Sequence, residues 1–276
     1  MPRKILGVIP ARFASTRFPG KVLAEIASKT MLQHVYERAS QARYLTSTLI
    51  ATDDDRVSRV AKSFGGRVRM TRADHLSGTD RVAEAAYSED AAVIVNIQGD
   101  EPLIDPAAID AAILPLVHDP EILMSTLKKR IEDEREIHDP NVVKVVTDRT
   151  GDAVYFSRCP IPYHRSAADF GDSLRNPQTA GASKPVPEMG GYFKHVGLYV
   201  YQRDFLLGYP ALPVGPLEQA ERLEQLRALE NGYPIRVVET EYESLGVDTP
   251  EDLERVRGLF GATMAGARGQ GPGAGE

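Results

Sequence analysis

Short apolar runs alternate with segments of helical periodicity in the first third of the chain. Four runs have the length of buried strands, at residues 4–9, 48–51, 68–70 and 92–97. Between them, apolar residues recur at the three- and four-residue spacing of amphipathic helices, at residues 31–42, 54–64 and 79–88. Strand–helix–strand repetition with short joins predicts an α/β fold with a mostly parallel sheet and helices on both faces. Ligands of such sheets bind at the carboxyl ends of the strands, so the loops after residues 9 and 97 are candidate sites.

The later part of the chain predicts a smaller mixed subregion at about residues 140–210. Residues 142–146 and 153–156 flank a turn and predict an antiparallel hairpin. The segment 217–229 predicts a helix that is charged on one side. Further strands are predicted at residues 195–201 and 234–239, and a final helix after Asp248.

The domain boundaries follow from length and composition. A length of 276 residues predicts between one and two domains, and we predict a single α/β domain over residues 1–260. The polar stretch at about 164–191 has no clear period and is interpreted as a surface loop or an insertion. The glycine-rich end, 261–276, predicts a disordered tail.

Composition argues against several classes of protein. No apolar run approaches a membrane span, and the first residues lead straight into a strand, so we expect neither an anchor nor a signal peptide. The lone Cys159 cannot form an internal disulfide, which favours the cytoplasm; we interpret it as a small, inert, buried residue. The formal net charge of −6 argues against nucleic acid as a partner.

The loop after the first predicted strand concentrates groups that bind phosphate. It carries two arginines, a lysine, two hydroxyls and a glycine, in Arg12, Ser15, Thr16, Arg17, Gly20 and Lys21. Arginine supplies forked donors and lysine a mobile charge, which suits a polyphosphate. The alternative is a solvated basic loop. The glycine spacing of a Walker loop or of a dinucleotide-binding motif is absent.

Two aspartates are candidate ligands of a metal ion. Asp100 follows an apolar strand, where a carboxylate can bind a hard divalent cation that also contacts phosphates. Alternatively, Asp100 caps the helix that begins near Pro106. Asp248 precedes Thr-Pro-Glu-Asp, and local evidence favours a helix N-cap there.

Three further segments carry polar groups with two possible roles each. Ser77 either starts a helix or belongs to a base-recognition loop with Arg72 and His75. Arg158 and His195 suit a substrate that bears a carboxylate, although a lone histidine at a strand start is more often structural.

In order along the chain, these segments resemble the 3-deoxy-manno-octulosonate cytidylyltransferases, or CMP-Kdo synthetases. The matching stretches span about residues 5–257 and read VIPARFASTRFPGK, ATDDDRV, MTRADHLSGTDR, VNIQGDEP, NVVKVV, YFSRCPIPY, HVGLYVY, PLEQAERLEQLR and GVDTPEDLERV. The arginine loop alone is also similar to that of sialic acid cytidylyltransferases.

The resemblance implies a nucleotide-diphospho-sugar-transferase-like fold and an enzyme that transfers the cytidylyl group of CTP to Kdo, for lipopolysaccharide biosynthesis. It implies Mg²⁺ on Asp100 and Asp248, which overrides the local preference for capping at Asp248. It implies a homodimer, with the second half of the chain supplying the dimerisation surface. The residues implied for CTP are Arg12, Ser15, Thr16, Arg17, Lys21, Arg72, Ser77 and, less directly, His75. Those implied for Kdo are Gln98, Arg158, His195, Tyr199 and the segment bearing Glu221, Glu224 and Gln225.

Three alternatives stay open at this point. The first is an enzyme whose acceptor is another 2-keto acid sugar, such as sialic acid or an amino analogue of Kdo. The second is a catalytically silent module that senses CTP, and the third is a scaffold protein. Intact Lys21, Asp100 and Asp248 favour an enzyme.

Overall fold

The computed structural model describes residues 3–14, 18–164 and 191–268, and only the helical backbone for 262–268. The chain divides into two compact units, each made of separate stretches. Unit 1 comprises Met1–Lys4, Asp90–Val95 and Ala107–Glu243, and unit 2 comprises Ile5–Glu89, Asn96–Pro106 and Ser244–Glu276. The single domain predicted over residues 1–260 stays a prediction.

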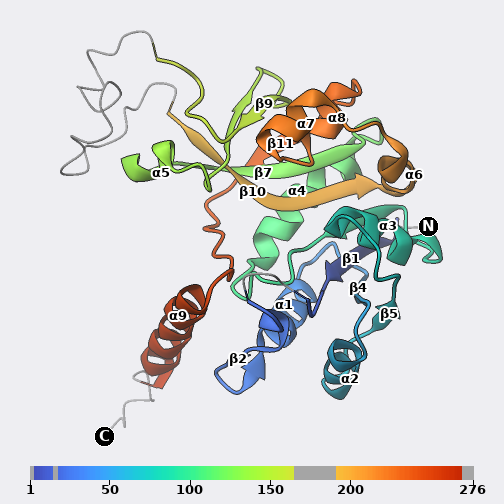
Figure 1. The fold of residues 1–276 in the computed structure, drawn as a ribbon, viewed down its shortest axis with the longest axis vertical. Coiled ribbons are helices and arrows are strands. Elements are labelled where there is room, and N and C mark those ends of the chain that lie inside the picture. The colour runs from blue at the N-terminus through green and yellow to red at the C-terminus, as the bar shows by residue number, and fades with distance from the viewer. Residues whose placement is uncertain (1–2, 15–17, 165–190, 269–276) are drawn as a thin grey trace, which may run out of the picture. The chain divides into compact units, whose positions relative to one another are not determined.

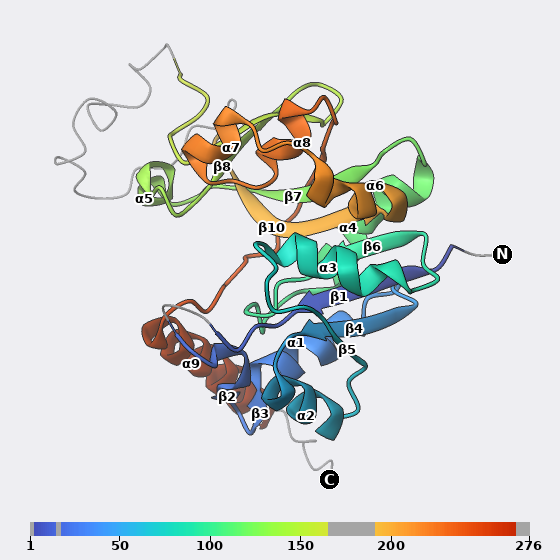
Figure 2. The ribbon, with the colours of Figure 1, turned by 45° about the vertical axis from the view of Figure 1, so that its right-hand side comes forward.

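Unit 2 is built on three parallel strands. Its elements are β1 (Ile5–Pro10), a 3-10 turn η1 (Lys21–Leu23), β2 (Glu25–Ile26), β3 (Lys29–Thr30), α1 (Met31–Ala39), β4 (Ser47–Thr52), α2 (Asp55–Ser63), β5 (Val68–Met70), α3 (Gly78–Tyr87) and α9 (Pro250–Arg268). Strands β1, β4 and β5 lie side by side in parallel, while β2 and β3 form a small antiparallel pair (Figure 1). Helices α1 and α2 pack on β4, and α3 packs on β1 and β4 (Figure 2).

The helices of unit 2 begin where the sequence places capping side chains. Thr30, Asp54 and Ser77 each accept a hydrogen bond from a backbone N–H in the first turn of the helix that follows. Asp54 thus starts α2, and Ser77 starts α3 as one of its two interpretations requires. Behind these caps, alternating apolar positions fill a fully buried core between strands and helices.

Unit 1 contains a mixed sheet. Its elements are β6 (Val93–Asn96), α4 (Pro106–His118), β7 (Met124–Arg130), α5 (Glu134–His138), β8 (Lys144–Thr147), β9 (Ala153–Ser157), β10 (Phe193–Gln202), α6 (Arg203–Gly208), η5 (Tyr209–Ala211), α7 (Pro216–Glu221), α8 (Leu226–Glu230) and β11 (Arg236–Glu239). The strand order is β11-β7-β10-β6, with β8 joining β10 to β9. Strand β11 runs parallel to β7, whereas β10 and the predicted β8–β9 hairpin are antiparallel to their neighbours.

The predicted helix over 217–229 is wrong in one respect, because the structure breaks it into α7 and α8. Arg222 adopts a left-handed conformation with φ of 52° at the break. Tertiary contacts compensate: Glu230 of α8 accepts the backbone N–H groups of Leu217 and Glu218 at 2.8 and 2.9 Å. Arg227 forms a two-pronged ion pair with Glu218 at 2.8 and 2.6 Å. No glycine or proline within the segment signals the break.

Three other expectations concern the periphery of the chain. Helix α9 continues to Arg268, beyond the boundary predicted at residue 261. Cys159 is exposed rather than buried, at the turn that follows β9. The polar stretch at 164–191 lies almost wholly outside the described residues.

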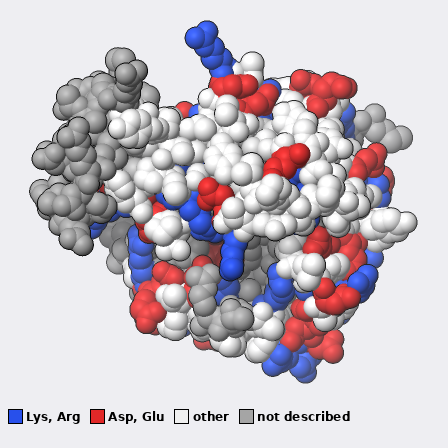
Figure 3. Space-filling view, turned by 45° about the horizontal axis from the view of Figure 1, so that its top comes forward, with Lys and Arg blue, Asp and Glu red and all other residues white. Residues whose placement is uncertain are grey.

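Two features of the described residues concern the membrane anchor and the nucleic-acid partner that composition argues against. Within the described residues, no helix is long and apolar enough to cross a membrane. On the face drawn in Figure 3, Lys and Arg side chains are interspersed with Asp and Glu.

Candidate active site

The loop after β1 brings Lys21 to the carboxyl end of the parallel strands of unit 2. Gly20 has φ of +73°, which favours glycine, and its backbone N–H bonds the carbonyl of Phe13 at 2.8 Å. A Cβ on Gly20 would lie 3.1 Å from the Phe13 ring, which leaves little room for another residue type. Lys21 follows Gly20 as the first residue of η1.

The segment after β6 brings Asp100 to the same edge. Gly99 permits this approach, because a Cβ there would lie 2.9 Å from the backbone oxygen of Pro10. The backbone N–H of Val247 bonds the carbonyl of Asp100 at 2.9 Å, which places the next residue, Asp248, beside it. Val247 is itself fixed in an apolar cluster with Ile26 and Met31.

Lys21 bridges the two aspartates. Its Nζ lies 2.6 Å from Oδ2 of Asp100 and 2.8 Å from Oδ1 of Asp248, and it also donates to the carbonyl of Val247 at 3.0 Å. Burial by itself lowers the pKa of Lys21, but the charges and hydrogen bonds of Asp100 and Asp248 outweigh it and raise that pKa. Lys21 therefore carries a full positive charge at neutral pH.

The capping interpretations of these aspartates are not supported. Thr249 caps α9: its hydroxyl accepts the N–H of Asp252 at 3.2 Å, and Asp252 accepts the N–H of Thr249 at 2.9 Å. Helix α4 begins at Pro106, too far along the chain for Asp100 to be its N-cap. Both carboxylates instead face Lys21.

These groups line one cavity of about 410 Å³ within unit 2. Its wall is formed by Pro10, Arg12, Ala14, Lys21, Val22, Gly78, Gln98, Gly99, Asp100 and Asp248. Of the residues predicted for CTP, Arg12 and Lys21 line this cavity, and Gln98, predicted for the sugar, lies there too. Ser15, Thr16 and Arg17 lie outside the described residues.

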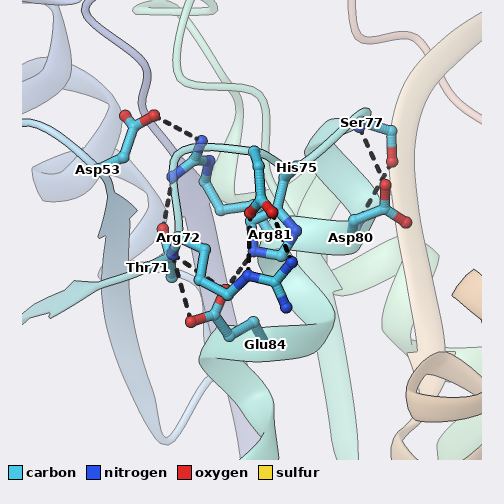
Figure 4. Close-up of polar contacts among 9 residues, drawn as sticks. Asp53, Thr71, Arg72, His75, Ser77, Asp80, Arg81 and Glu84 are labelled. Carbon is cyan, nitrogen blue, oxygen red and sulfur yellow. Dashed lines mark hydrogen bonds and ion pairs between the residues drawn. The ribbon is translucent and has the colours of Figure 1, made fainter.

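The residues predicted near the base do not line this cavity. Arg72 pairs with Asp74 at 2.9 and 2.7 Å, and Ser77 exchanges two hydrogen bonds with Asp80 (Figure 4). His75 contacts a carboxylate oxygen of Glu84. Gly78, the first residue of α3, links this loop to the wall of the cavity.

The donor set at the cavity fits a hard divalent cation. Asp100 and Asp248 already share one cationic group, so their oxygens converge on a position that favours positive charge. No group of three or more His, Cys, Asp or Glu side chains of the described residues could hold a metal ion. The protein would thus supply two carboxylates, and substrate oxygens and water the remaining ligands.

Arg158, one of the residues predicted for the sugar, is held by backbone carbonyls of unit 1. Its Nε donates to the carbonyl of Glu221 at 2.7 Å and its Nη1 to that of Pro140 at 2.8 Å. The Glu221 carboxylate accepts the Ser157 hydroxyl at 2.6 Å and the Arg158 backbone N–H at 2.9 Å. Burial opposes ionisation of Glu221, but these hydrogen bonds lower its pKa. Glu221 therefore orders the segment around Arg158.

The two other acidic or amide candidates lie in the break between α7 and α8. The backbone oxygen of Glu224 accepts the Tyr209 hydroxyl at 2.7 Å, and Gln225 is buried. The helix expected to carry them together with Glu221 does not exist as one element, so the three side chains do not share a helical face.

His195 and Tyr199 come together on β10, across a bulge. Their ring centroids are 5.3 Å apart, and Nε2 of His195 lies 2.9 Å from the hydroxyl of Thr126. That hydroxyl donates to the carbonyl of Leu198 at 2.8 Å, so it accepts from His195, whose proton is on Nε2. Burial lowers the pKa of His195 to about 3, and raises that of Tyr199. At neutral pH, His195 is uncharged, and only Arg158 supplies the positive charge expected of this pair.

The lowered pKa of His195 predicts a pH effect on stability. Between about pH 6.5 and pH 3, the unfolded chain binds a proton at this histidine and the folded chain does not, so stability falls as pH falls. In His195→Gln, we expect the unfolding free energy to fall less steeply in this window, by up to about 1 kcal/mol per pH unit. Urea titrations across the window measure the slope. An unchanged slope in His195→Gln would contradict the prediction.

Sequence reasoning missed Glu84 and Thr126, which contact predicted site residues, and Arg81, which contacts Thr71 beside them. The spacing of Ser77, Asp80, Arg81 and Glu84 was the available signal for the first two. Nothing local marks Thr126, because its role depends on the pairing of β7 with β10.

A lysine and two carboxylates beside the carboxyl ends of parallel strands suit the phosphates of a nucleotide and a cation bound to them. Accordingly, residues 6–241 match the family described as cytidylyltransferase. A 3-deoxy-manno-octulosonate cytidylyltransferase of Solibacter usitatus is 74% identical over 271 residues, or 98% of this chain and 100% of the relative. One of Syntrophotalea carbinolica is 58% identical over 252 residues, or 91% of this chain and 96% of the relative. A solved CMP:2-keto-3-deoxy-manno-octonic acid synthetase complexed with CTP has a TM-score of 0.84 and 43% identity, over 94% of this chain and 99% of that one. The chain belongs to the 3-deoxy-manno-octulosonate cytidylyltransferase family.

Proposed function

We propose that the chain transfers the cytidylyl group of CTP to the anomeric hydroxyl of Kdo, giving CMP-Kdo and pyrophosphate for lipopolysaccharide biosynthesis. The observation that carries this proposal is the Lys21–Asp100–Asp248 arrangement in the cavity of unit 2. The names of the relatives and the CTP in the similar solved structure support the nucleotide and the sugar.

The reaction needs no covalent bond between the substrates and a protein side chain. The anomeric oxygen of Kdo forms a bond to the α-phosphorus of CTP, the bond from that phosphorus to pyrophosphate breaks, and the hydroxyl proton is released. Positioning and charge stabilisation dominate such transfers. Lys21 and Arg12 line the cavity as donors, and we assign them, with Ser15, Thr16 and Arg17, to the triphosphate. Lys21 neutralises charge that builds on the leaving pyrophosphate.

A divalent cation, for which we propose Mg²⁺, would be held by Asp100 and Asp248 and would supply Lewis-acid stabilisation of phosphate charge. With the cation bound, the carboxylates no longer need the ammonium group as their only counter-charge. Lys21 has the long, flexible stem that lets an ammonium reach a neighbouring phosphate oxygen.

We assign the sugar to side chains of unit 1; Gln98, also predicted for the sugar, lines the cavity of unit 2. Arg158 is exposed enough to meet the Kdo carboxylate, and its hydrogen bonds to two carbonyls hold its guanidinium in place. His195 and Tyr199 provide neutral polar edges, which suit sugar hydroxyls. Glu224 and Gln225 complete the proposed set, whereas the Glu221 carboxylate is engaged by Ser157 and Arg158.

The experiment is pyrophosphate release from CTP in the presence of Mg²⁺, with Kdo, with N-acetylneuraminate and without sugar. We expect release with Kdo alone. Release only with N-acetylneuraminate would retain the nucleotide chemistry and reject the sugar assignment. CTP binding without release from any sugar would favour the nucleotide-sensing alternative.

We also propose a homodimer in the cytoplasm. Unit 1 exposes large apolar side chains in the region assigned to pairing, Val154 at 61% and Tyr163 at 80% of their surface. A single cysteine agrees with a reducing compartment. Sedimentation equilibrium tests the dimer: a monomer at micromolar concentration contradicts it.

A further inference from the structure

Helix α3 presents a stripe of polar side chains to the loop that precedes it. Its N-cap Ser77 and the residues Asp80, Arg81 and Glu84 follow the three- and four-residue spacing that places side chains on one side of a helix. Figure 4 shows these side chains directed at the segment 71–77 and at Asp53. The stripe therefore contacts the loop at its start, its middle and its end.

Arg81 fixes the start of the loop. Its side chain is completely buried, with Nη2 at 3.0 Å from Oδ2 of Asp53 and Nη1 hydrogen-bonded to the hydroxyl of Thr71. The backbone N–H of Thr71 in turn bonds the carbonyl of Thr52 at 2.9 Å, at the end of β4. A buried ion pair adds little net stability, because desolvation offsets the attraction between the charges. Its main consequence here is a defined geometry at the carboxyl end of β4 and β5.

Glu84 fixes the middle of the loop. Its carboxylate accepts the backbone N–H of Arg72 at 3.1 Å and contacts the ring nitrogen Nε2 of His75. Burial opposes ionisation of Glu84, but these two partners lower its pKa, so the carboxylate stays charged at neutral pH. Two loop residues three positions apart are thus attached to one side chain of α3.

The end of the loop leads directly into the cavity. Ser77 and Asp80 form a reciprocal capping box, at 3.0 and 3.1 Å, and the next residue, Gly78, lines the cavity with Lys21 and Asp100. One helix therefore forms part of the cavity wall and also fixes the shape of the loop beside it.

We propose that Arg81 and Glu84 are positioning residues that hold the Thr71–Ser77 loop in the shape that selects cytosine over uracil. This inference rests on the proposed function. Cytosine offers an amino donor and a ring-nitrogen acceptor where uracil offers a carbonyl acceptor and an N–H donor. Polar groups that are fixed in place match one of these patterns and oppose the other, whereas a mobile loop adapts to both.

The test compares CTP with UTP in Glu84→Gln, which keeps the shape of the side chain and removes its charge. We expect the ratio of kcat/KM for CTP to that for UTP to fall about tenfold or more. The loss should appear as a higher KM for CTP, with kcat at saturating CTP within about twofold of wild type, because no group at the reacting phosphorus changes.

The matched control is Glu89→Gln, just beyond the same helix. Glu89 pairs with Arg67 and Arg69 at 3.1 and 2.7 Å and is more buried than Glu84. If Glu84 acted only through stability, the two variants would lower the melting temperature alike and leave the CTP-to-UTP ratio unchanged. We expect the ratio to change in Glu84→Gln alone.

Thr71→Val provides a second variant of nearly equal volume, and it removes the hydroxyl that Arg81 contacts. We expect the same direction of change in the nucleotide ratio. A wild-type enzyme that prefers CTP, with that preference intact in both Glu84→Gln and Thr71→Val, would overturn this inference and leave the proposed function standing. A wild-type protein that releases no pyrophosphate from CTP with any sugar would overturn both.

Discussion

Asp100→Asn is expected to lower kcat by about a thousandfold and to leave the chain folded. Asparagine keeps the shape of the side chain and an oxygen that can accept from Lys21, so the local packing survives. It removes the negative charge that a hard divalent cation prefers in its ligands. It also leaves Asp248 as the only carboxylate partner of the Lys21 ammonium. Turnover is measured by pyrophosphate release at saturating CTP and Kdo.

Separate measurements check that Asp100→Asn is folded and that the loss of turnover is specific to this aspartate. Circular dichroism should be unchanged, and the melting temperature should move by no more than about 3 °C. The control is Asp90→Asn, which breaks an exposed ion pair with Lys4 at 2.6 Å and should retain wild-type turnover. Asp100→Asn activity within a few-fold of wild type would remove Asp100 from the proposed chemistry.

The parallel strands could be read from the sequence because burial on both faces leaves a continuous apolar run. Predicted strands at 4–9, 48–51 and 68–70 correspond to β1, β4 and β5 to within one residue at each end. The α/β class followed from their alternation with helices, and it is confirmed. The division into two units could not be predicted from the sequence, because each unit combines stretches that are distant in the chain.

The meeting of Asp100 with Asp248 lies beyond local reasoning. It depends on contacts between segments that are far apart in sequence, among them the backbone hydrogen bond from Val247 to Asp100 and the packing of Val247. The sequence around Asp248 does predict a helix N-cap, but the capping residue is the next one, because Thr249 and Asp252 form the cap. Of the arguments from sequence, only the family resemblance predicted that Asp100 and Asp248 share one site.

The region assigned to the sugar was less predictable, for two physical reasons. Helical propensity alone extends one helix over 217–229, whereas the contacts of Glu230 and Arg227 stabilise a break at Arg222. The charge of His195 depends on burial beside Thr126, and burial is a property of the folded sheet rather than of the local sequence.

Lys21→Met is expected to lower kcat/KM for CTP by about a hundredfold or more. Methionine retains the apolar stem but removes the ammonium that lies between two carboxylates. Because the pKa of Lys21 is raised above its ordinary value of 10.5, its ammonium group keeps its charge throughout the neutral range and loses it only at higher pH. The difference between Lys21→Met and wild type should therefore persist across the whole neutral range.

The nucleotide chosen for binding separates a phosphate role from a general loss of structure. CMP lacks the two phosphates that we assign to Lys21, so its affinity should stay within about twofold of wild type, whereas that of CTP should fall about tenfold. Calorimetry with each nucleotide measures both affinities. Lys29→Met is the control, because Lys29 is also ion-paired, with Glu37 at 2.5 Å, but lies outside the cavity of unit 2. Equal losses for CMP and CTP would show that Lys21 supports the structure of the cavity as a whole. A selective loss for CTP places its charge at the leaving pyrophosphate, where in-line transfer requires it.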